Sequence, residues 1–212
     1  MTNRSVDRNG TGKWKHKDKL TELLTYVEHE EARTLLVKEE NGAKSHKDGG
    51  DPQGALSSGE FGGVLEGVFR LASKTDFQWK ETAILGEATV QVFDYRVERA
   101  NSILNVGAGT TLFVGCHGQV FIDAATRGVR RITMVADDLP NTERVRAASV
   151  SVDYDYVAIN NHDYLLPIAA QIMITLGAGS HESDLNEIKF RNFRRFGSNV
   201  RILDESSQLR PR

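Results

Sequence analysis

One segment carries its apolar side chains at the spacing of an α-helix. These positions recur at intervals of three and four residues: Phe61, Val64, Leu65, Val68 and Phe69. Just before them, Ser57 and Glu60 have the spacing of a capping box. Gly62, Gly63 and Gly67 each lower the intrinsic stability of this helix by ~1 kcal/mol relative to alanine. We therefore expect the helix to form by packing its apolar face, most simply against a sheet.

Most of the chain after this helix alternates between apolar and polar positions. The strand that shows it best has Val150, Val152, Tyr154 and Tyr156 on one face and Ser151, Asp153 and Asp155 on the other. The turn formers of residues 160–163 follow, and residues 164–168 resume the strand pattern. Pro167 cannot donate to a strand ladder, so it predicts a bulge or a sheet edge.

A second hairpin is predicted from Gly118 to Ala136. Asp123 can accept hydrogen bonds from amides of its turn, and Gly128 can supply a positive φ before the return strand. Further strands are predicted at Phe77–Thr82, Thr89–Val97, Thr111–Val114 and Glu187–Phe193.

The segment from Leu20 to Lys38 fits either a helix or a hairpin, and the β character of the neighbouring chain favours the hairpin. Antiparallel strands with one helix predict an all-β or an α+β fold, with the sheet layered on the helix. The composition divides the chain into a disordered basic tail (1–19), a single β-rich domain (20–203) and a frayed C-terminal tail (204–212). Residues 39–54 are expected to form a surface loop.

Composition and charge exclude several classes of protein. Lys and Arg total 27 against 29 Asp and Glu, a net charge of −2 that creates no overall field for nucleic acid. No apolar run approaches the ~20 residues of a membrane-spanning helix. The single cysteine, Cys116, cannot form an internal disulfide or a multi-thiolate metal site. The basic start is not followed by an apolar segment, so it does not read as a signal peptide.

Candidate catalytic residues are sparse. Cys116 and His117 are adjacent, and neighbours on a strand point to opposite faces, which disfavours a nucleophile–base pair. The six histidines lack metal-ligand spacing, and the strand carboxylates Asp153 and Asp155 fit a solvated face better than a cation site. Asp137 and Asp138 suggest an Asx-type turn. We expect no catalytic residue, no metal and no cofactor.

One basic and aromatic patch lies near the C-terminus, with Arg191, Arg194, Arg195 and Arg201 among Phe190, Phe193 and Phe196. Such a pattern can bind single-stranded nucleic acid, or it can be a strand whose arginines extend along its edge. The near-neutral charge favours the structural interpretation. Residues 107–109, a Gly-Ala-Gly, lack the lysine and helix of a phosphate loop.

Several segments together resemble a family of uncharacterised bacterial envelope proteins. They are Leu56-Ser-Ser-Gly-Glu-Phe-Gly62, Val92-Phe-Asp-Tyr-Arg-Val97, Gly118-Gln-Val-Phe-Ile-Asp123 with Arg131-Ile132, Val152-Asp-Tyr-Asp-Tyr-Val157, Tyr164-Leu-Leu-Pro167 and Asn186-Glu-Ile-Lys-Phe-Arg-Asn-Phe-Arg-Arg-Phe-Gly197. More distantly, the chain resembles the outer-membrane lipoprotein carrier (LolA-like) superfamily, mainly through the hairpin motif at 118–123 followed by Arg-Ile. The nearer resemblance covers roughly residues 20–203.

The resemblance implies a mostly-β α+β fold, in which a curved antiparallel half-barrel has a helix on its concave face. It also implies a cavity for an apolar ligand or for an acyl chain of a lipid or lipoprotein, lined by Phe61, Leu65, Phe69, Tyr154 and Tyr156. A non-enzymatic binding protein of the periplasm or cell envelope is then expected, although a cytoplasmic location is the alternative. The alternative function is a structural module that binds an envelope protein; a hydrolase using Cys116 or dispersed histidines and carboxylates is less favoured.

Overall fold

A computed structural model describes residues 1–28, 30–46, 60–106, 111–140, 144–177 and 181–195. In these residues eleven strands form one antiparallel sheet. In chain order they are β1 (Thr2–Asp7), β2 (Lys15–Val27), β3 (Glu30–Glu40), β4 (Ala43–His46), β5 (Asp76–Leu85), β6 (Ala88–Val97), β7 (Cys116–Asp123), β8 (Val129–Ala136), β9 (Val145–Ile159), β10 (His162–Leu176) and β11 (Ser183–Lys189). The helix α1 spans Gly63–Phe69, and the short 3-10 turns η1 and η2 span Leu71–Ser73 and Arg99–Asn101.

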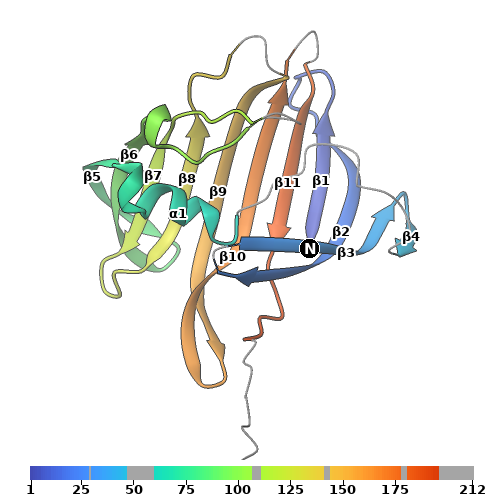
Figure 1. The fold of residues 1–212 in the computed structure, drawn as a ribbon. Helices are drawn as coiled ribbons and strands as arrows, with labels where there is room; N and C mark the ends of the chain where they lie inside the picture. The colour runs from blue at the N-terminus through green and yellow to red at the C-terminus, as the bar shows by residue number, and fades with distance from the viewer. Residues whose placement is uncertain (29, 47–59, 107–110, 141–143, 178–180, 196–212) are drawn as a thin grey trace, which may run out of the picture.

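The sheet is open and strongly curved, and α1 lies on its concave side (Figure 1). Its strand order is β4-β3-β2-β1-β11-β10-β9-β8-β7-β6-β5, so β4 and β5 are the two edges. The predicted fold class, a mostly-β α+β protein with a curved antiparallel sheet and a helix on its concave face, is confirmed. Among the described residues no helix is long and apolar enough to cross a membrane.

The N-terminal segment differs most from its prediction. Thr2–Asp7 forms β1, which pairs with β2 on one side and with β11 on the other. The prediction of a disordered tail over residues 1–19 is therefore wrong. Its polar composition hid the strand because a buried position of β1 is held by the charged Arg4, which pairs with the buried Asp18. Residues 204–212 lie outside the described residues.

The apolar core lies between α1 and the middle of the sheet. Val68 of α1 is buried in a cluster with side chains from β6 to β11, including Tyr95, Ile132, Val152 and Ile172. Val64 and Leu65 pack against the same cluster. The predicted apolar face of the helix is thus the face that contacts the sheet, and burial of each such side chain stabilises the fold by ~1.5–3 kcal/mol.

The helix starts later than its sequence pattern predicts. Its N-cap is Gly62, with no side-chain cap, so the helix begins at Gly63. Ser57, the other half of the predicted capping box, lies outside the described residues. Glu60 does not cap the helix; its carboxylate is buried and forms an ion pair with Arg33 of β3.

The hairpin predictions are largely confirmed. β9 and β10 pair across Asn160 and Asn161, both at positive φ, and the register shifts at Pro167, which marks the predicted bulge. Asp123 accepts hydrogen bonds from two amides of the β7–β8 turn. The positive φ in that turn belongs to Arg127, not to Gly128, so this detail of the prediction is wrong.

The other predicted strands and loops are confirmed only in part. The segment from Leu20 to Lys38 is the hairpin of β2 and β3, as favoured. No named strand forms at residues 111–114, where the described chain shows one isolated bridge, Asn105 with Phe113. β11 ends at Lys189, short of the predicted end. The expected loop at 39–54 instead contains β4, and its residues 47–54 lie outside the described residues.

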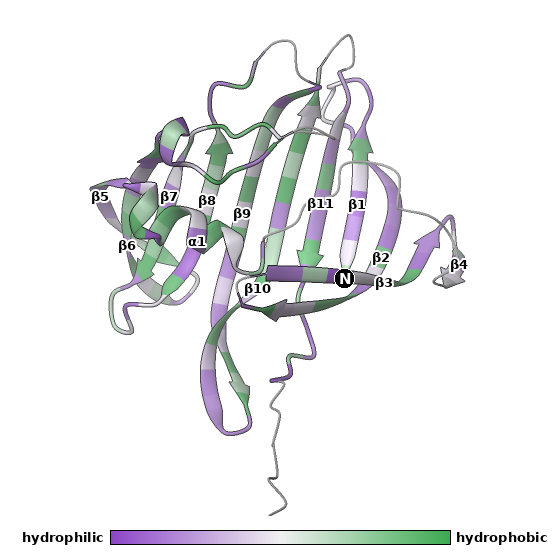
Figure 2. Cartoon of the chain, in the orientation of Figure 1, coloured by the Kyte–Doolittle hydropathy of each residue, from purple (hydrophilic) through white to green (hydrophobic). Residues whose placement is uncertain are grey.

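Polar and charged side chains are buried on the concave face where β1 meets β2. β10 is mostly hydrophobic, whereas β1 is mostly hydrophilic (Figure 2). Arg4 and Asp18 lie opposite each other in the register and form a two-pronged ion pair, with side-chain exposures of 3% and 1%. Lys38 Nζ of β3 lies 3.5 Å from Asp18 Oδ2. One buried carboxylate therefore holds together the strands β1, β2 and β3.

We predict that Asp18→Asn lowers the free energy of unfolding by about 3–5 kcal/mol at pH 7, because it removes the charge that faces buried Arg4. Burial raises the pKa of Asp18, but the hydrogen bond and charge of Arg4 and the charge of Lys38 lower it more, so the pKa lies below its ordinary value of 3.8. This stabilisation is therefore complete above that ordinary value and is lost as the pH falls through the lower pKa of the folded state.

Urea denaturation of both proteins between pH 3 and pH 7 measures this difference. Asp163→Asn, at an exposed position of β10, is the matched control and should change the free energy of unfolding little. An equal effect of the two substitutions at pH 7 would show that the Asp18 ion pair does not stabilise the fold.

Candidate functional site

The concave side of the sheet is closed where the β2–β3 hairpin meets the chain leading into α1. Arg33 of β3 donates to Glu31 at 2.6 Å and to Glu60 at 2.5 Å. Glu31 also accepts a hydrogen bond of 3.1 Å from the backbone N–H of Phe61. Burial lowers the pKa of Arg33, but the charges of Glu60 and Glu31 raise it more, so its net pKa is raised. These contacts hold the start of the helix against the hairpin.

Aromatic rings fill the same side. Phe61 lies at the centre, with ring centroids 5.4 Å from Tyr26, 5.7 Å from Phe190 and 6.5 Å from Phe193. A Cβ at Gly62 would lie 2.3 Å from the Tyr26 hydroxyl, so a larger residue there would displace the Tyr26 ring. The closed side is thus built from three distant parts of the sequence.

The opposite side of the concave face is open and carries exposed apolar side chains. Phe69 at the end of α1 stacks on Phe77 of β5 with ring centroids 5.5 Å apart. Leu71 is 97% exposed and Trp79 is 58% exposed. We call these four side chains (Phe69, Leu71, Phe77 and Trp79) the aromatic rim. The rim continues into the core through the contact of Phe77 with buried Tyr95.

The pairing of β5 with β6 explains why these side chains lie on the concave face. Phe77 pairs with Tyr95 and Trp79 pairs with Phe93, so they share the concave face with two side chains of the core region. A register shift follows Trp79, after which Ile84 returns to the same face at 70% exposure. Because β5 is an edge strand, no neighbouring strand covers these side chains on their outer side.

One buried hydroxyl inside the core has no hydrogen-bond partner among the described residues. Tyr154 of β9 is 3% exposed, and its hydroxyl makes no hydrogen bond. Burial raises the pKa of this phenol above its ordinary value of 10.0. The hydroxyl is therefore neutral, and an unsatisfied buried hydroxyl of this kind costs ~1–3 kcal/mol.

The five residues expected to line one cavity lie in four places. Phe61 belongs to the closed side, Leu65 and Tyr154 belong to the packed core, and Phe69 belongs to the aromatic rim. Tyr156 lies near the far end of β9, 42% exposed, with its hydroxyl near Gly128. The structure brings Leu65 and Tyr154 into one cluster and does not bring all five together.

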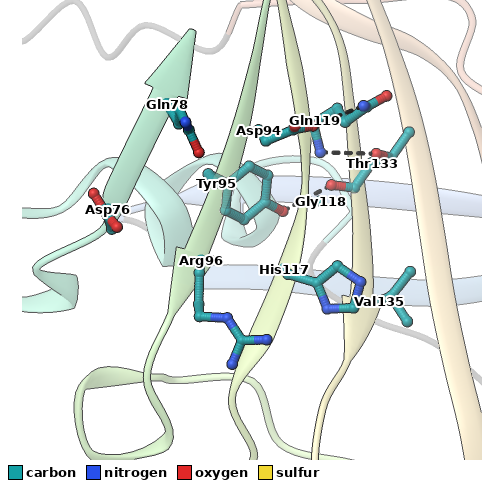
Figure 3. Close-up of a pocket in the computed structure, with 10 residues that line it drawn as sticks. All are labelled: Asp76, Gln78, Asp94, Tyr95, Arg96, His117, Gly118, Gln119, Thr133 and Val135. Atoms are coloured by element: carbon teal, nitrogen blue, oxygen red, sulfur yellow. Dashed lines mark hydrogen bonds between the residues drawn. The ribbon is translucent and has the colours of Figure 1, made fainter. Parts of the chain in front are cut away.

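Among the described residues, α1 lines neither of two pockets in the sheet. The larger has a volume of about 560 Å³ and opens on the convex face across β5 to β8 (Figure 3). The smaller, about 280 Å³, lies at the tip of the β2–β3 hairpin. The sequence analysis identified neither pocket, nor Leu71, Phe77 and Trp79 of the rim. The alternation of Phe77 and Trp79 along β5 was the signal available for the rim.

Cys116 and His117 point to opposite faces of β7, as expected for neighbours on a strand. Cys116 is buried in the core, whereas the His117 ring lies on the convex face with Nδ1 2.6 Å from Asp137 Oδ1. The sequence placed Asp137 only in a turn, and its contact with His117 needed the register of β7 and β8. Burial, with a smaller contribution from Asp137, raises the pKa of Cys116 to about 11.

The other charged candidates are held by structural contacts. Asp153 pairs with Arg131 at 2.5 Å, and Asp155 pairs with Arg130 at 2.7 Å. Arg195 donates to the Tyr164 hydroxyl at 3.0 Å. Residues 107–109, 196 and 201 lie outside the described residues. Within the described ranges no group of three or more His, Cys, Asp and Glu side chains is arranged to bind a metal ion.

No protein-family model, curated protein or solved structure matches the chain. The class of protein is therefore defined by its own architecture. An open, curved sheet has its concave face covered at one end by the β2–β3 hairpin and the start of α1, and it bears the aromatic rim at the other end. The similarity to the LolA-like superfamily rests on the motifs quoted above and stays a proposal.

We predict that Cys116 reacts slowly with iodoacetamide in the native protein at pH 7.5. A pKa of about 11 in place of 9.0 lowers the thiolate fraction about 100-fold, and only the thiolate is the nucleophile. The alkylation rate, followed by mass spectrometry, should rise at least that much in 6 M guanidinium chloride. Equal rates in the native and unfolded protein would show that the thiol is accessible and activated.

Proposed function

We propose that the protein binds an apolar ligand, the acyl chain of a lipid or lipoprotein, at the aromatic rim on the concave side of the sheet. The observation that carries the proposal is the exposure of Leu71 and Trp79, each two residues along the chain from a member of the stacked pair Phe69 and Phe77. Exposed apolar side chains that adjoin one another mark a binding site more often than isolated ones do.

The energetics favour a chain-like apolar ligand. Removing apolar surface from water yields about 25 cal/mol per Å², so covering large, exposed side chains such as Leu71 and Trp79 supplies binding energy without a charged contact. The closed side, held by Arg33 and Phe61, leaves the rim as the exposed end of the concave face. The unsatisfied hydroxyl of Tyr154 is the polar group that a ligand or a water molecule entering the core would meet.

The proposed setting is the periplasm or cell envelope, and the proposed activity is binding without catalysis. Both follow from the resemblance to envelope proteins and to lipoprotein carriers. The contact of His117 with Asp137 lies on the other face of the sheet from the rim. The side chains that define the proposed ligand site, Phe69, Leu71, Phe77 and Trp79, are apolar or aromatic.

The same edge supports a second candidate, a module that binds an envelope protein. β5 ends the sheet order, so one edge of its backbone has no partner strand in the sheet, and an extended peptide can add to such an edge. Ile84, 70% exposed on the concave face of β5, gives this edge a further apolar contact. Native mass spectrometry separates the two candidates, since one expects a bound lipid and the other a bound protein.

We predict that the protein binds a dansyl-labelled undecanoic acid and that the double variant Leu71→Ser, Trp79→Ser binds it at least 10-fold more weakly. Loss of about 1.4 kcal/mol suffices for that change, and each apolar side chain can contribute as much on burial. Dansyl fluorescence measures the affinity.

The matched control is Trp14→Ser, because Trp14 is also partly exposed, at 38%, but lies outside β5 and α1. It should leave the affinity unchanged. An absence of binding by the native protein, or equal binding by the rim variant with an unchanged melting temperature, would contradict the proposed site.

A further inference from the structure

The larger pocket lies on the convex face, and its side chains form two ordered rows. The first row crosses β5, β6 and β7 as Asp76, Arg96 and His117, which are register partners. The second row lies beside it as Gln78, Asp94 and Gln119. Figure 3 shows these side chains around one opening. The pocket is thus built from adjacent positions of a rigid sheet.

The floor of this pocket lies where β6, β7 and β8 pair around Gly118. The Thr133 carbonyl accepts a hydrogen bond of 2.8 Å from the Tyr95 hydroxyl, and the Gln119 N–H donates to the Thr133 hydroxyl at 3.0 Å (Figure 3). A Cβ at Gly118 would lie 1.9 Å from the Thr133 carbonyl oxygen. Glycine at this position is therefore required for the floor.

Two of the polar side chains are held in place before any ligand arrives. His117 Nδ1 lies 2.6 Å from Asp137 Oδ1, so this contact holds the ring and leaves its Nε2 for a ligand. Gln119 donates to Asp94 at 2.8 Å, which fixes the plane of its amide. Fixed polar groups lose less conformational entropy on binding than mobile ones do.

The charges of the pocket do not favour an ionic ligand. Asp76 and Asp94 lie beside Arg96, and Lys80 and Asp137 add one charge of each sign nearby. Lys80 Nζ is 3.6 Å from Asp94, and Arg96 Nη2 is 3.9 Å from Asp137. Acids and cations are interspersed, so neither a phosphate nor a polyamine meets a patch of opposite charge.

We propose that this pocket is a second binding site, which takes a neutral polyhydroxylated ligand, a short saccharide. Amide, carboxylate and guanidinium groups offer both donors and acceptors, and each sugar hydroxyl is both a donor and an acceptor. The volume of 560 Å³ lies within the ~300–1,000 Å³ typical of small-molecule sites. The site is on the opposite face from the aromatic rim, so it is independent of the proposed acyl-chain site.

The test is a titration of the full-length ¹⁵N-labelled protein with maltotriose, cellotriose and tri-N-acetylchitotriose, followed by NMR. At least one of these probes should shift the side-chain amides of Gln78 and Gln119 and the backbone amide of Gly118, in a saturable way. Gln78→Ala, at an exposed position of the edge strand, should weaken that binding at least 5-fold.

Gln171→Ala is the matched control, since Gln171 is also exposed and lies on the convex face, on β10. It should leave the affinity unchanged. Inorganic phosphate and spermidine serve as ionic probes. The proposal is overturned if none of the three saccharides shifts these amides, if only an ionic probe does, or if Gln78→Ala binds as tightly as the native protein. The dansyl-acid titration reports separately on the rim, so failure at either site is distinguishable from failure at the other.

Discussion

The whole sheet depends on the insertion of β1 between β2 and β11. Without β1, the strands β2–β4 would lose their strand pairing to the meander of β5–β11, because no other described strand joins these two sets. The insertion places Arg4 and Asp18 face to face in a buried position, where each charge needs the other. The pairing of β1 with β11 thus joins β2–β4 to the meander that carries both proposed sites.

Around β5 and β6, the curved sheet has two different faces, an apolar concave face and a polar convex face. On the concave side, the helix and the aromatic rings around Phe61 close one end and leave Phe69, Phe77 and Trp79 at the other. On the convex side, the same strands β5 and β6 present polar side chains, because side chains alternate between faces. One edge of the sheet therefore offers an apolar surface and a polar pocket back to back.

The two surfaces also differ in what holds them. The rim is exposed and includes the stacked contact of Phe69 with Phe77, whereas the convex pocket is held by hydrogen bonds among β6, β7 and β8. Apolar association tolerates loose geometry, since it scales with area, but recognition of hydroxyl groups requires donors and acceptors in fixed positions. Each proposed ligand class matches the rigidity of its surface.

The sequence by itself determined the parts that depend on local periodicity. Its alternation predicted β9, β10 and the β7–β8 hairpin, and its helical spacing predicted the face of α1 that Val68 buries. Tertiary structure decided the rest. The polar sequence of β1 shows no apolar alternation, and the strand is explained only by the pairing of Arg4 with Asp18 in the folded sheet. Likewise, His117 contacts Asp137 only because of the register of β7 and β8. The dispersal of the expected cavity residues, from Phe61 at the closed side to Phe69 at the rim, has the same cause: periodicity specifies which face a side chain occupies, and only the curvature and pairing of distant strands decide what that face meets.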